Sequence, residues 1–312
     1  MQQEMKYVYQ VYLDGSISRA AEHLYITQPA LSMAIQKIEK ELGMPLFDRG
    51  TRPLTLTVAG QIYIKAVRQT MFLEQDMAQQ MEDVRELRTG NICIGGSHYL
   101  NSYILPQVLT GFSRKYPGIH LQLVEHSSAH LAQMLTDREL DLTFNCDPAF
   151  LENFQRFPAF YDHILLAVPK EDPINQGLTR AALTSRDISK KWHLKKSCPT
   201  VELAQFNELE FLVLAPGNNL HDRGRQLFQE AGFVPKIKME ITQLATAYHL
   251  AEYGLAATFV SDRLVRGERD SLCYYKLDSH LIERLFYILL PEQKYTSFAV
   301  RTFIQYFTDQ ML

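Results

Sequence analysis

The chain has 312 residues, 46% of them hydrophobic, which is enough for two or three domains with apolar cores of their own. Its 32 Lys and Arg residues face 35 Asp and Glu residues, and this net charge of −3 argues against binding nucleic acid through overall positive charge. The four cysteines lie far apart with no C-x-x-C pair, so the sequence indicates neither a zinc module nor a disulfide scaffold.

No segment of the sequence has the length of a membrane span. The longest apolar runs, such as residues 285–290, are far shorter than the roughly 20 residues that a spanning helix needs. Residues 1–6 begin with polar side chains and lack the charged flank and apolar centre of a secretory signal. We therefore expect a soluble, cytoplasmic protein without a membrane partner.

Two short helices are predicted within residues 16–47. Ser16 and Thr27 are N-cap residue types directly before helical apolar spacing, and Pro29 falls in the first turn of the second helix, where a missing N–H costs little. Three- and four-residue steps predict a buried side for each helix: Ala20, Ala21 and Leu24 in the first, and Ala30, Leu31, Ile35 and Ile38 in the second. The pattern fits a helix-turn-helix, and it also fits the commoner helical hairpin.

The second helix has a polar side as well. Its first turns carry mostly compact donors and acceptors that suit a major groove: Gln28, Ser32, Met33, Gln36 and Lys37. The amide of Gln28 can pair with an adenine edge, and Pro29 and Ala30 offer apolar contact to a thymine methyl. Ser32, Gln36 and Lys37 lie where phosphate contacts are expected.

Residues 16–49 read S-I-S-R-A-A-E-H-L-x-I-T-Q-P-A-L-S-x-x-I-x-K-I-E-x-E-L-G-x-P-L-F-D-R, and residues 56–60 read L-T-V-A-G. Both stretches closely resemble the N-terminal signature of LysR-type transcriptional regulators. The resemblance implies that residues 1–58 form a winged helix-turn-helix that binds double-stranded promoter or operator DNA. The capping residues Ser16 and Thr27 are counted among the candidate DNA-binding residues.

A short hairpin is predicted after these helices. Gly50 and Pro53 are turn-forming residues within it, and the apolar Leu54 and Leu56 stand at every second position, as in a strand. By resemblance it is the wing of the family, in which Arg52 would enter the minor groove and Arg49 would support a backbone contact.

Thr57 can cap a helix that runs to about residue 88 without an internal proline. Its apolar seam consists of Ala66, Leu73, Met77, Val84 and Leu87, with Thr70 and Gln80 in the same register. Such a seam fits a helix packed on its own domain and equally one that pairs with a second copy. The resemblance implies the second case, a linker helix over residues 59–89 that forms a homodimer, with a homotetramer also expected.

Residues 90–312 alternate between strand and helix patterns, which predicts a parallel sheet. The strands are expected at residues 91–95, 119–125, 141–145, 211–215, 236–241, 255–260 and 284–290, and the helices at 101–116, 129–138, 220–231, 243–253 and 296–308. With K-Y-P-G-I at 115–119 and E-L-D-L at 139–142, this region resembles the two-lobed, periplasmic-binding-protein-like (type 2) effector domain of the same family. Lobe I would span about 90–165 and 268–312, and lobe II about 166–267. Residues 172–203 exceed the family's usual connection and carry no recognisable motif.

Polar side chains follow the predicted strand ends. Ligands of open α/β sheets bind beyond those ends, and hydroxyls, amides and helix N-termini suit a small anion such as a carboxylate. The candidate effector-binding residues are Ser97, His98, Tyr99, Ser127, Ser128, Asn145, Cys146, Asn218, Gln243 and Thr246. The alternative is that they are solvated caps.

Two chemical alternatives stay open, although we expect neither a metal nor a cofactor. His126 and His130 are spaced at i and i+4, and with His98 and Cys146 they could converge on a zinc-type ion. Cys198 ends the basic segment 190–198, and nearby cations lower the pKa of a thiol, which would suit redox sensing. A solvated run of charge explains the same segment.

The sequence carries no G-x-S-x-G, phosphate loop or H-E-x-x-H motif, so we expect no enzyme. A pure solute-binding protein would explain the two lobes but would not need residues 1–90. The sequence therefore predicts a sequence-specific, LysR-type transcriptional regulator whose activity depends on a small molecule bound between the lobes. The alternative is a small-molecule sensor without a transcriptional role.

Overall fold

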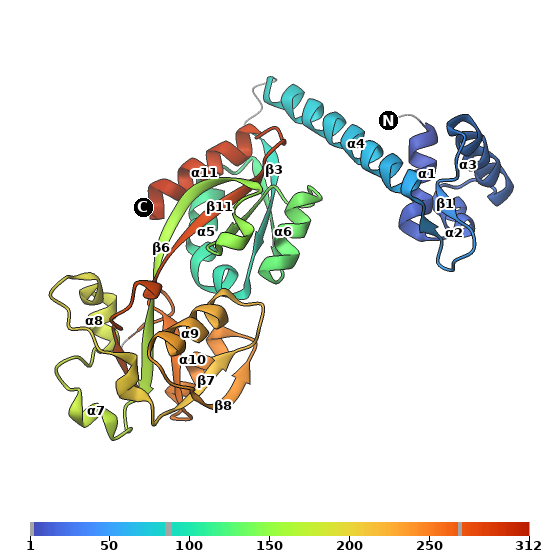
Figure 1. The fold of residues 1–312 in the computed structure, drawn as a ribbon. Coiled ribbons are helices and arrows are strands. Elements are labelled where there is room, and N and C mark those ends of the chain that lie inside the picture. Colours follow the sequence, from blue (N-terminus) through green and yellow to red (C-terminus); the bar gives the residue numbers. More distant parts are fainter. Residues whose placement is uncertain (1–2, 85–88, 268–269, 312) are drawn as a thin grey trace. The chain divides into compact units, whose positions relative to one another are not determined.

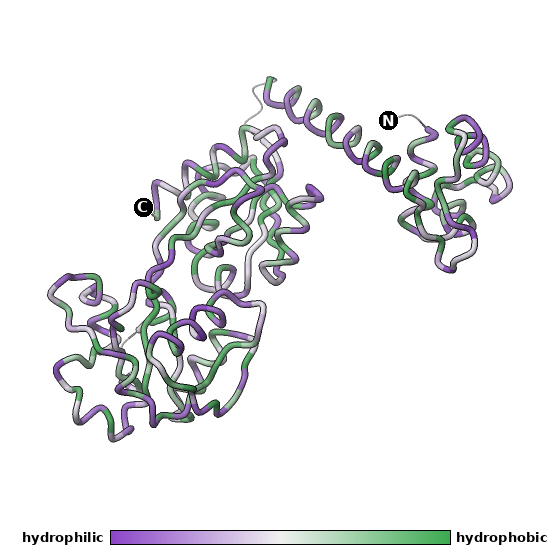
Figure 2. Tube along the Cα trace, in the orientation of Figure 1, coloured by the Kyte–Doolittle hydropathy of each residue, from purple (hydrophilic) through white to green (hydrophobic). Residues whose placement is uncertain are grey.

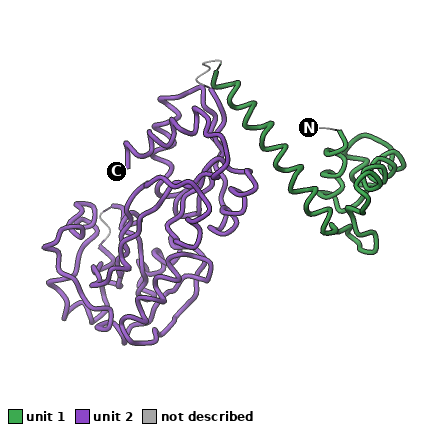
Figure 3. Tube along the Cα trace, turned by 45° about the horizontal axis from the view of Figure 1, so that its top comes forward, with its two compact units in different colours: residues 1–86 green, residues 87–312 purple. Residues whose placement is uncertain are grey.

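The computed structural model of this chain describes residues 3–84, 89–267 and 270–311 (Figure 1). The chain divides into two compact units, residues 1–86 and residues 87–312 (Figure 3).

The first unit is helical with one short hairpin. In chain order it contains α1 Gln3–Asp14, α2 Ile17–His23, α3 Gln28–Leu42, β1 Phe47–Asp48, β2 Thr55–Leu56 and α4 Val58–Val84. Strands β1 and β2 pair antiparallel, which confirms the predicted hairpin.

Local capping explains where α2 and α3 begin. The Ser16 hydroxyl accepts a hydrogen bond from the backbone N–H of Arg19, and the Thr27 hydroxyl accepts one from Ala30, each at 3.4 Å. Helix α3 ends at Gly43, whose φ of 71° is the left-handed conformation that glycine adopts without strain. Both predicted helix starts are therefore confirmed.

The core of the first unit lies among its helices. Its buried residues are Val8, Val11, Ala20, Ala21, Leu31, Ile35, Ile38, Leu46, Phe47 and Ile64. The prediction that Ala30 is buried is wrong: Ala30 is exposed. It lies about 100° around the helix from Leu31, outside the narrow stripe that packs inward.

Helix α4 packs closely at its start and is apolar along its length. A Cβ at Gly60 would lie 2.0 Å from the carbonyl oxygen of Leu46, so only glycine lets the first turn of α4 approach that backbone. Further along, Ile64 and Val67 are buried, whereas hydrophobic residues on another side of the helix are exposed. Hydrophobic positions recur along α4 (Figure 2).

The second unit is built on one mixed sheet. Its strands are β3 Gly90–Gly96, β4 Ile119–Glu125, β5 Leu142–Asn145, β6 Phe154–Pro169, β7 Glu210–Leu214, β8 Lys236–Ile241, β9 Ala257–Ser261, β10 Leu272–Tyr275 and β11 Glu283–Pro291. The strand order is β4-β3-β5-β11-β6-β9-β7-β8, with β10 also paired to β6. Pairs β3–β4, β3–β5, β7–β8 and β7–β9 are parallel, as the alternating pattern predicted.

Helices complete the two lobes of this unit. They are a π-helix at Leu100–Ile104, α5 Leu105–Lys115, α6 Ser128–Thr136, α7 Ile174–Gly177, α8 Ser185–Ser189, α9 Asn219–Glu230, α10 Leu244–Glu252 and α11 Phe298–Met311. Aromatic rings fill the centre of each lobe: Phe112 packs edge-on against Phe303 in lobe I, and Phe211 against Phe228 in lobe II. Each lobe thus has its own apolar core.

Strand β6 joins the two lobes, and the sequence did not predict it. Residues 154–163 pair antiparallel with β11, and residues 164–167 pair antiparallel with β9. Its 16 residues mix polar and apolar side chains without a steady alternation, because one strand serves two differently shaped cores. The lobes therefore share a continuous strand at their crossing (Figure 1).

The return of the chain to lobe I lies later than predicted. The sequence places residues 268–312 in lobe I, but strand β10 within this range pairs with the second half of β6. Leu272, Tyr274 and Tyr275 are buried in the lobe II core, so this assignment is wrong. The chain re-enters lobe I through β11.

Residues 172–203 are a packed part of lobe II. The Asn175 amide donates to the carbonyl oxygens of Pro169 and Lys170, and Thr184 and Asp187 form a reciprocal capping box at α8. Leu183, Ile188, His193, Cys198 and Val201 are buried there. The segment contributes to the core of lobe II, and one of its buried residues is a histidine.

Candidate functional site

The start of α3 presents a solvent-facing surface. Thr27, Gln28, Pro29, Ala30, Met33 and Gln36 are exposed, and Ser32 is half-buried. Met33 has 69% of its surface exposed although its side chain is apolar. These side chains are accessible, as the predicted base contacts require.

The predicted phosphate-binding cations are already engaged within the first unit. Lys37 Nζ lies 3.2 Å from a Glu4 carboxylate oxygen and 3.7 Å from one of Glu41, and the hydrogen bond to Glu4 raises the pKa of Lys37. Arg49 Nη2 donates to Glu39 at 2.9 Å. If Lys37 and Arg49 contact phosphates as the sequence predicts, each has to leave its carboxylate partner.

Glu39 also fixes the base of the wing. One of its oxygens accepts the backbone N–H of Leu46 at 2.9 Å and that of Phe47 at 3.3 Å. Arg52, beyond these contacts, is exposed in the hairpin. The Ser16 hydroxyl serves as the cap of α2, a structural role that the sequence also indicated.

The predicted dimer seam is exposed along α4. Leu73 is 70% exposed, Met77 58% and Val84 78%, and Ala66 is exposed as well. The structure adds Val58, Ile62 and Met81 to this surface, and Leu87 lies outside the described residues. An exposed apolar stripe of this length marks a surface suited to protein contact.

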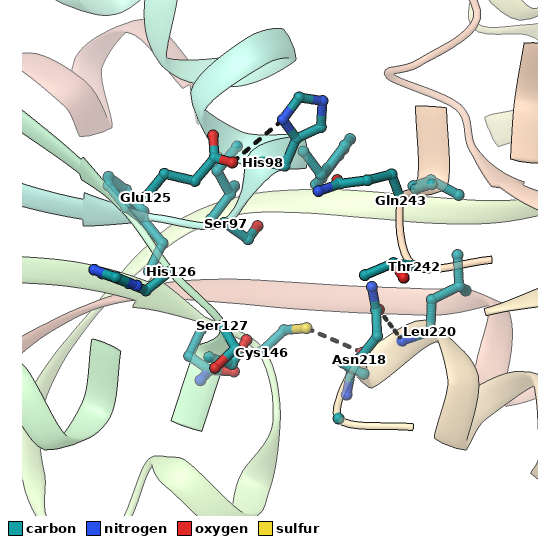
Figure 4. A pocket seen from close by; sticks show the side chains of 18 of the residues that line it. Ser97, His98, Glu125, His126, Ser127, Cys146, Asn218, Leu220, Thr242 and Gln243 are labelled. Atoms are coloured by element: carbon teal, nitrogen blue, oxygen red, sulfur yellow. Dashed lines mark hydrogen bonds and ion pairs between the residues drawn. The ribbon is translucent and has the colours of Figure 1, made fainter. Parts of the chain in front are cut away.

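A cavity of about 360 Å³ lies between lobe I and lobe II. It is lined by nine of the ten predicted effector-binding residues: Ser97, His98, Tyr99, Ser127, Ser128, Asn145, Cys146, Asn218 and Gln243. Side chains of lobe I, among them Ser97 and Ser127, face Asn218 and Gln243 of lobe II across the opening (Figure 4). The strand ends therefore meet as predicted.

Thr246 is the exception. It is exposed on α10 and does not line the cavity, whereas Thr242, before the helix, does. The sequence missed Glu125, Arg284 and Phe286, which line the same cavity. Arg284 and Phe286 come from the returning strand β11, and no local signal connects that strand with the ends of the first three.

A buried polar cluster supports the cavity floor. Arg284 Nε donates to Asp162 Oδ2 at 2.8 Å, and the Tyr99 hydroxyl donates to Asp162 Oδ1 at 2.5 Å. Ser261 donates to the same oxygen. The cluster joins β6, β9, β11 and the start of the π-helix, so residues from both lobes meet at one carboxylate.

Burial sets the protonation states in this cluster. Burial and the Asp162 charge raise the pKa of Tyr99 well above its usual value, so its hydroxyl remains a donor. Burial lowers the pKa of Arg284, but the Asp162 charge, the hydrogen bond to Asp162 and the other neighbouring groups together outweigh burial and raise that pKa overall. Burial raises the pKa of Cys146 to about 11, and its thiol donates to Asn219 Oδ1 at 3.2 Å. Cys146 is thus a neutral hydrogen-bond donor.

The structure does not assemble the metal site considered from the sequence. The rings of His126 and His130 are 4.3 Å apart. His98 Nδ1, however, lies 3.5 Å from the Glu125 carboxylate, and the Cys146 thiol donates a hydrogen bond to Asn219. In the described part of the chain, a different group of three residues with potential metal ligands lies together, namely His163, His193 and Asp262.

Cys198 is not an activated thiol. It is buried, and this burial raises the pKa of Cys198, while the Lys276 charge opposes the shift only in part. The basic segment 190–198 therefore does not create the low-pKa thiol that redox sensing would need.

Comparison with known proteins decides the family. The family model described as LysR substrate binding domain matches residues 85–312, and the model described as bacterial regulatory helix-turn-helix protein, lysR family, matches residues 2–61. The chain belongs to the LysR family. It is a transcriptional regulator with a helix-turn-helix DNA-binding domain and an effector-binding domain, and regulators of this family are not enzymes.

Relatives of this LysR-family regulator align along most of its length. It is 27% identical over 301 residues to the uncharacterized HTH-type transcriptional regulator YcgK of Bacillus subtilis, covering 96% of this chain and 92% of the relative. It is 26% identical over 301 residues to a probable RuBisCO transcriptional regulator of Nostoc sp., and the match covers 94% of this chain and 83% of the relative.

Solved structures of LysR-family proteins share the fold of this regulator. Full-length CbnR complexed with its target DNA matches with a TM-score of 0.61 and 17% identity over 99% of both chains. Full-length BenM matches with a TM-score of 0.55 and 21% identity over 100% of this chain and 99% of that one.

Among the described helices of this chain, none has the apolar length required to cross a bilayer.

Proposed function

We propose that this LysR-family regulator responds to a small carboxylate bound in the cavity between its lobes. Four helices begin at that cavity, directly after Tyr99, Ser127, Asn218 and Gln243. The N-terminal end of a helix carries partial positive charge and unpaired N–H groups, which favour anions. This convergence of helix starts is the observation that carries the proposal.

The side chains around the helix starts support an anionic ligand. Gln243 makes no side-chain cap to α10, so the first N–H groups of α10 face the cavity without a capping side chain. The Arg284 guanidinium adds a positive charge to the lining of the cavity. Glu125 is the opposing charge, and it lies beside His98 on the lobe I side (Figure 4).

A thermal-shift screen tests the ligand class. Small organic acids and their methyl esters are added to the full-length protein, and a binding acid raises the melting temperature by mass action whereas its ester does not. The Asn218→Asp variant keeps the capping oxygen of α9 but adds a negative charge to the cavity, so the shift should disappear. Asn207→Asp makes the same change of charge outside the cavity and should keep it.

Two results would contradict the carboxylate. One is a set of acids and esters that raise the melting temperature equally; the other is an acid whose effect survives Asn218→Asp. A gel shift with the DNA upstream of the gene, with and without the acid, then shows whether the ligand changes DNA binding.

We further propose that the protein acts as a homodimer through the exposed stripe of α4, with two dimers forming a tetramer. Two copies of the helix-turn-helix would then meet palindromic half-sites with matching two-fold symmetry. The apolar residues Leu73, Met77 and Val84 support this use of α4, because their exposure in a single chain leaves a surface for a partner.

A further inference from the structure

Two histidines and an aspartate meet in lobe II, outside the ligand cavity. His163 lies on β6, His193 lies in the 3-10 helix Trp192–Leu194 within the long segment 172–203, and Asp262 follows β9. One potential ligand atom of each lies within 4.8 Å of the others. Within the residues that the structure describes, this is the only such group of three.

One carboxylate oxygen faces both imidazoles. Asp262 Oδ2 lies 2.9 Å from His193 Nε2 and 3.4 Å from His163 Nδ1. The other oxygen, Oδ1, accepts the backbone N–H of His163 at 3.1 Å, which fixes the orientation of the carboxylate. The potential ligand atoms of the three residues therefore lie close together, with Asp262 Oδ2 near both imidazoles.

The two separations from Asp262 are close to those between ligands of a small tetrahedral cation, and the nitrogens of the two histidines lie within 4.8 Å of each other. Ligands about 2.0–2.2 Å from tetrahedral zinc lie roughly 3.3–3.5 Å from one another. The separation between His163 and Asp262, 3.4 Å, already has this value, and the His193 separation of 2.9 Å has to open by only a few tenths of an ångström.

A second carboxylate, that of Glu283, lies near the other ring nitrogen of His163. Its second nitrogen, Nε2, lies 3.5 Å from Glu283 Oε2 at the start of β11. When Nε2–H donates to Glu283, the lone pair of Nδ1 is directed at the common centre, which is the usual arrangement around metal-bound histidines. His193 is 2% exposed, and its Nδ1 has no hydrogen-bond partner among the described atoms. Nε2 is thus the nitrogen through which His193 makes its polar contact.

We propose that His163 Nδ1, His193 Nε2 and Asp262 Oδ2 bind one divalent transition cation of the zinc class, with water as the remaining ligand. Two imidazoles and one carboxylate favour Zn²⁺ over Mg²⁺ and Ca²⁺, which prefer oxygen ligands. The carboxylate of Glu283 positions His163 without touching the cation.

The site lies where β6 passes from one lobe to the other. His163 is paired with Glu283 of β11, and the next residue, Ile164, is paired with Ser261 of β9. A cation here ties the segment 172–203, through His193, to the strand crossing. Binding therefore stabilises the second unit rather than one loop.

Zinc titration of the full-length protein tests the site. Chelator-treated protein without a histidine tag is titrated with ZnCl₂ by calorimetry and then heated with and without the ion. We expect one ion per chain and a higher melting temperature, because zinc binds only the folded arrangement. Cobalt should bind in its place with the visible absorption of a tetrahedral complex, and Mg²⁺ should produce no heat.

Variants separate this site from other histidines. His193→Gln keeps an N–H near Asp262 but removes the ligand, so it should abolish tight binding. Glu283→Gln, at a largely exposed side chain, should fold normally and lower zinc affinity about 10- to 100-fold. His126→Gln is the control: it alters the exposed pair of rings His126 and His130 in lobe I and should leave the zinc affinity unchanged.

Two results would overturn the proposal. If zinc binding is lost in His126→Gln and retained in His193→Gln, the ion sits at the exposed histidine pair. If the wild-type protein takes up no zinc while His193→Gln lowers its melting temperature, the cluster is a hydrogen-bonded brace only.

Discussion

Arg284 and Asp162 stand opposite each other on β11 and β6, and Arg284 Nε donates to the Asp162 carboxylate at 2.8 Å. Both side chains are buried, at 4% and 0% exposure. Tyr99 binds the same carboxylate from lobe I, and Ser261 binds it from the end of β9. One ion pair therefore connects the strand crossing with the floor of the ligand cavity.

Removing one partner of this pair should destabilise the second unit strongly. Arg284→Leu leaves Asp162 buried without its counter-charge, and we expect a loss of about 3–5 kcal/mol in the free energy of unfolding. Urea unfolding measures the loss. The double variant Arg284→Leu and Asp162→Asn should recover part of it, because no uncompensated charge remains.

The exposed pair Lys236 and Glu208 provides the control. Lys236→Met should change the free energy of unfolding by only about 0–1 kcal/mol, since solvent screens that pair. Equal losses for Arg284→Leu and Lys236→Met would show that the buried pair has no special role.

The stripe on α4 should control assembly. Leu73→Lys with Met77→Lys places charges in an apolar interface, so the protein should become monomeric and lose operator binding while lobes I and II stay folded. Light scattering measures the mass. The control, Gln75→Lys with Ala78→Lys, adds the same charge on other sides of the helix and should stay dimeric. If the variant with Leu73→Lys and Met77→Lys stays dimeric, the dimer interface lies elsewhere on the protein.

The start of α3 should read bases. Gln28→Ala should cost about 1–3 kcal/mol on the preferred operator and flatten the preference at one base position per half-site, because an amide that pairs with adenine is lost. Competition binding against operators changed one base pair at a time measures this. A uniform loss with unchanged base preference would point to Met33 or Gln36 instead.

Lys37 should act on phosphates. Lys37→Ala should weaken binding to all DNA sequences alike and reduce the salt dependence of binding, because each subunit then neutralises one phosphate charge fewer. Glu4→Gln removes the carboxylate 3.2 Å from Lys37 and should have the opposite effect on affinity. Binding at two salt concentrations tests both variants, and an unchanged salt slope in Lys37→Ala would argue against a phosphate contact.

Cys146 should resist thiol reagents below alkaline pH. Burial raises the pKa of Cys146 from 9.0 to about 11, so at pH 8 the folded protein holds roughly 100-fold less thiolate at this position than the unfolded chain. In a variant with the other three cysteines replaced by serine, labelling at pH 8 should be slower than in urea by at least that factor. Comparable rates in both states would contradict the neutral thiol.

The same pKa has a consequence for stability. The unfolded thiol ionises near pH 9, and the folded one only near pH 11. The contribution of the neutral Cys146 thiol to the free energy of unfolding is therefore complete below pH 9 and is lost as the pH rises toward 11. Comparing the parent protein with Cys146→Ser across this range isolates the effect.

Features determined by neighbouring residues could be predicted from the sequence. Ser16 and Thr27 cap helices through N–H groups only three residues away, so their pattern is local. Strands β4 and β8 begin and end at the predicted residues, because short runs bounded by turn signals mark them. Nine effector candidates gather at one cavity since they follow predicted strand ends, whereas Thr246, a turn further along α10, does not.

Only the tertiary structure decided features that join distant residues. Asp162 meets Arg284 from 122 positions away, and His193 meets Asp262 from 69 positions away. Strand β6 belongs to two cores, so no single apolar period marks it, and β10 joins lobe II because its tyrosines are buried there. Such pairings depend on which strands lie side by side, and that choice is made by burial over the whole unit rather than by the residues next in the chain.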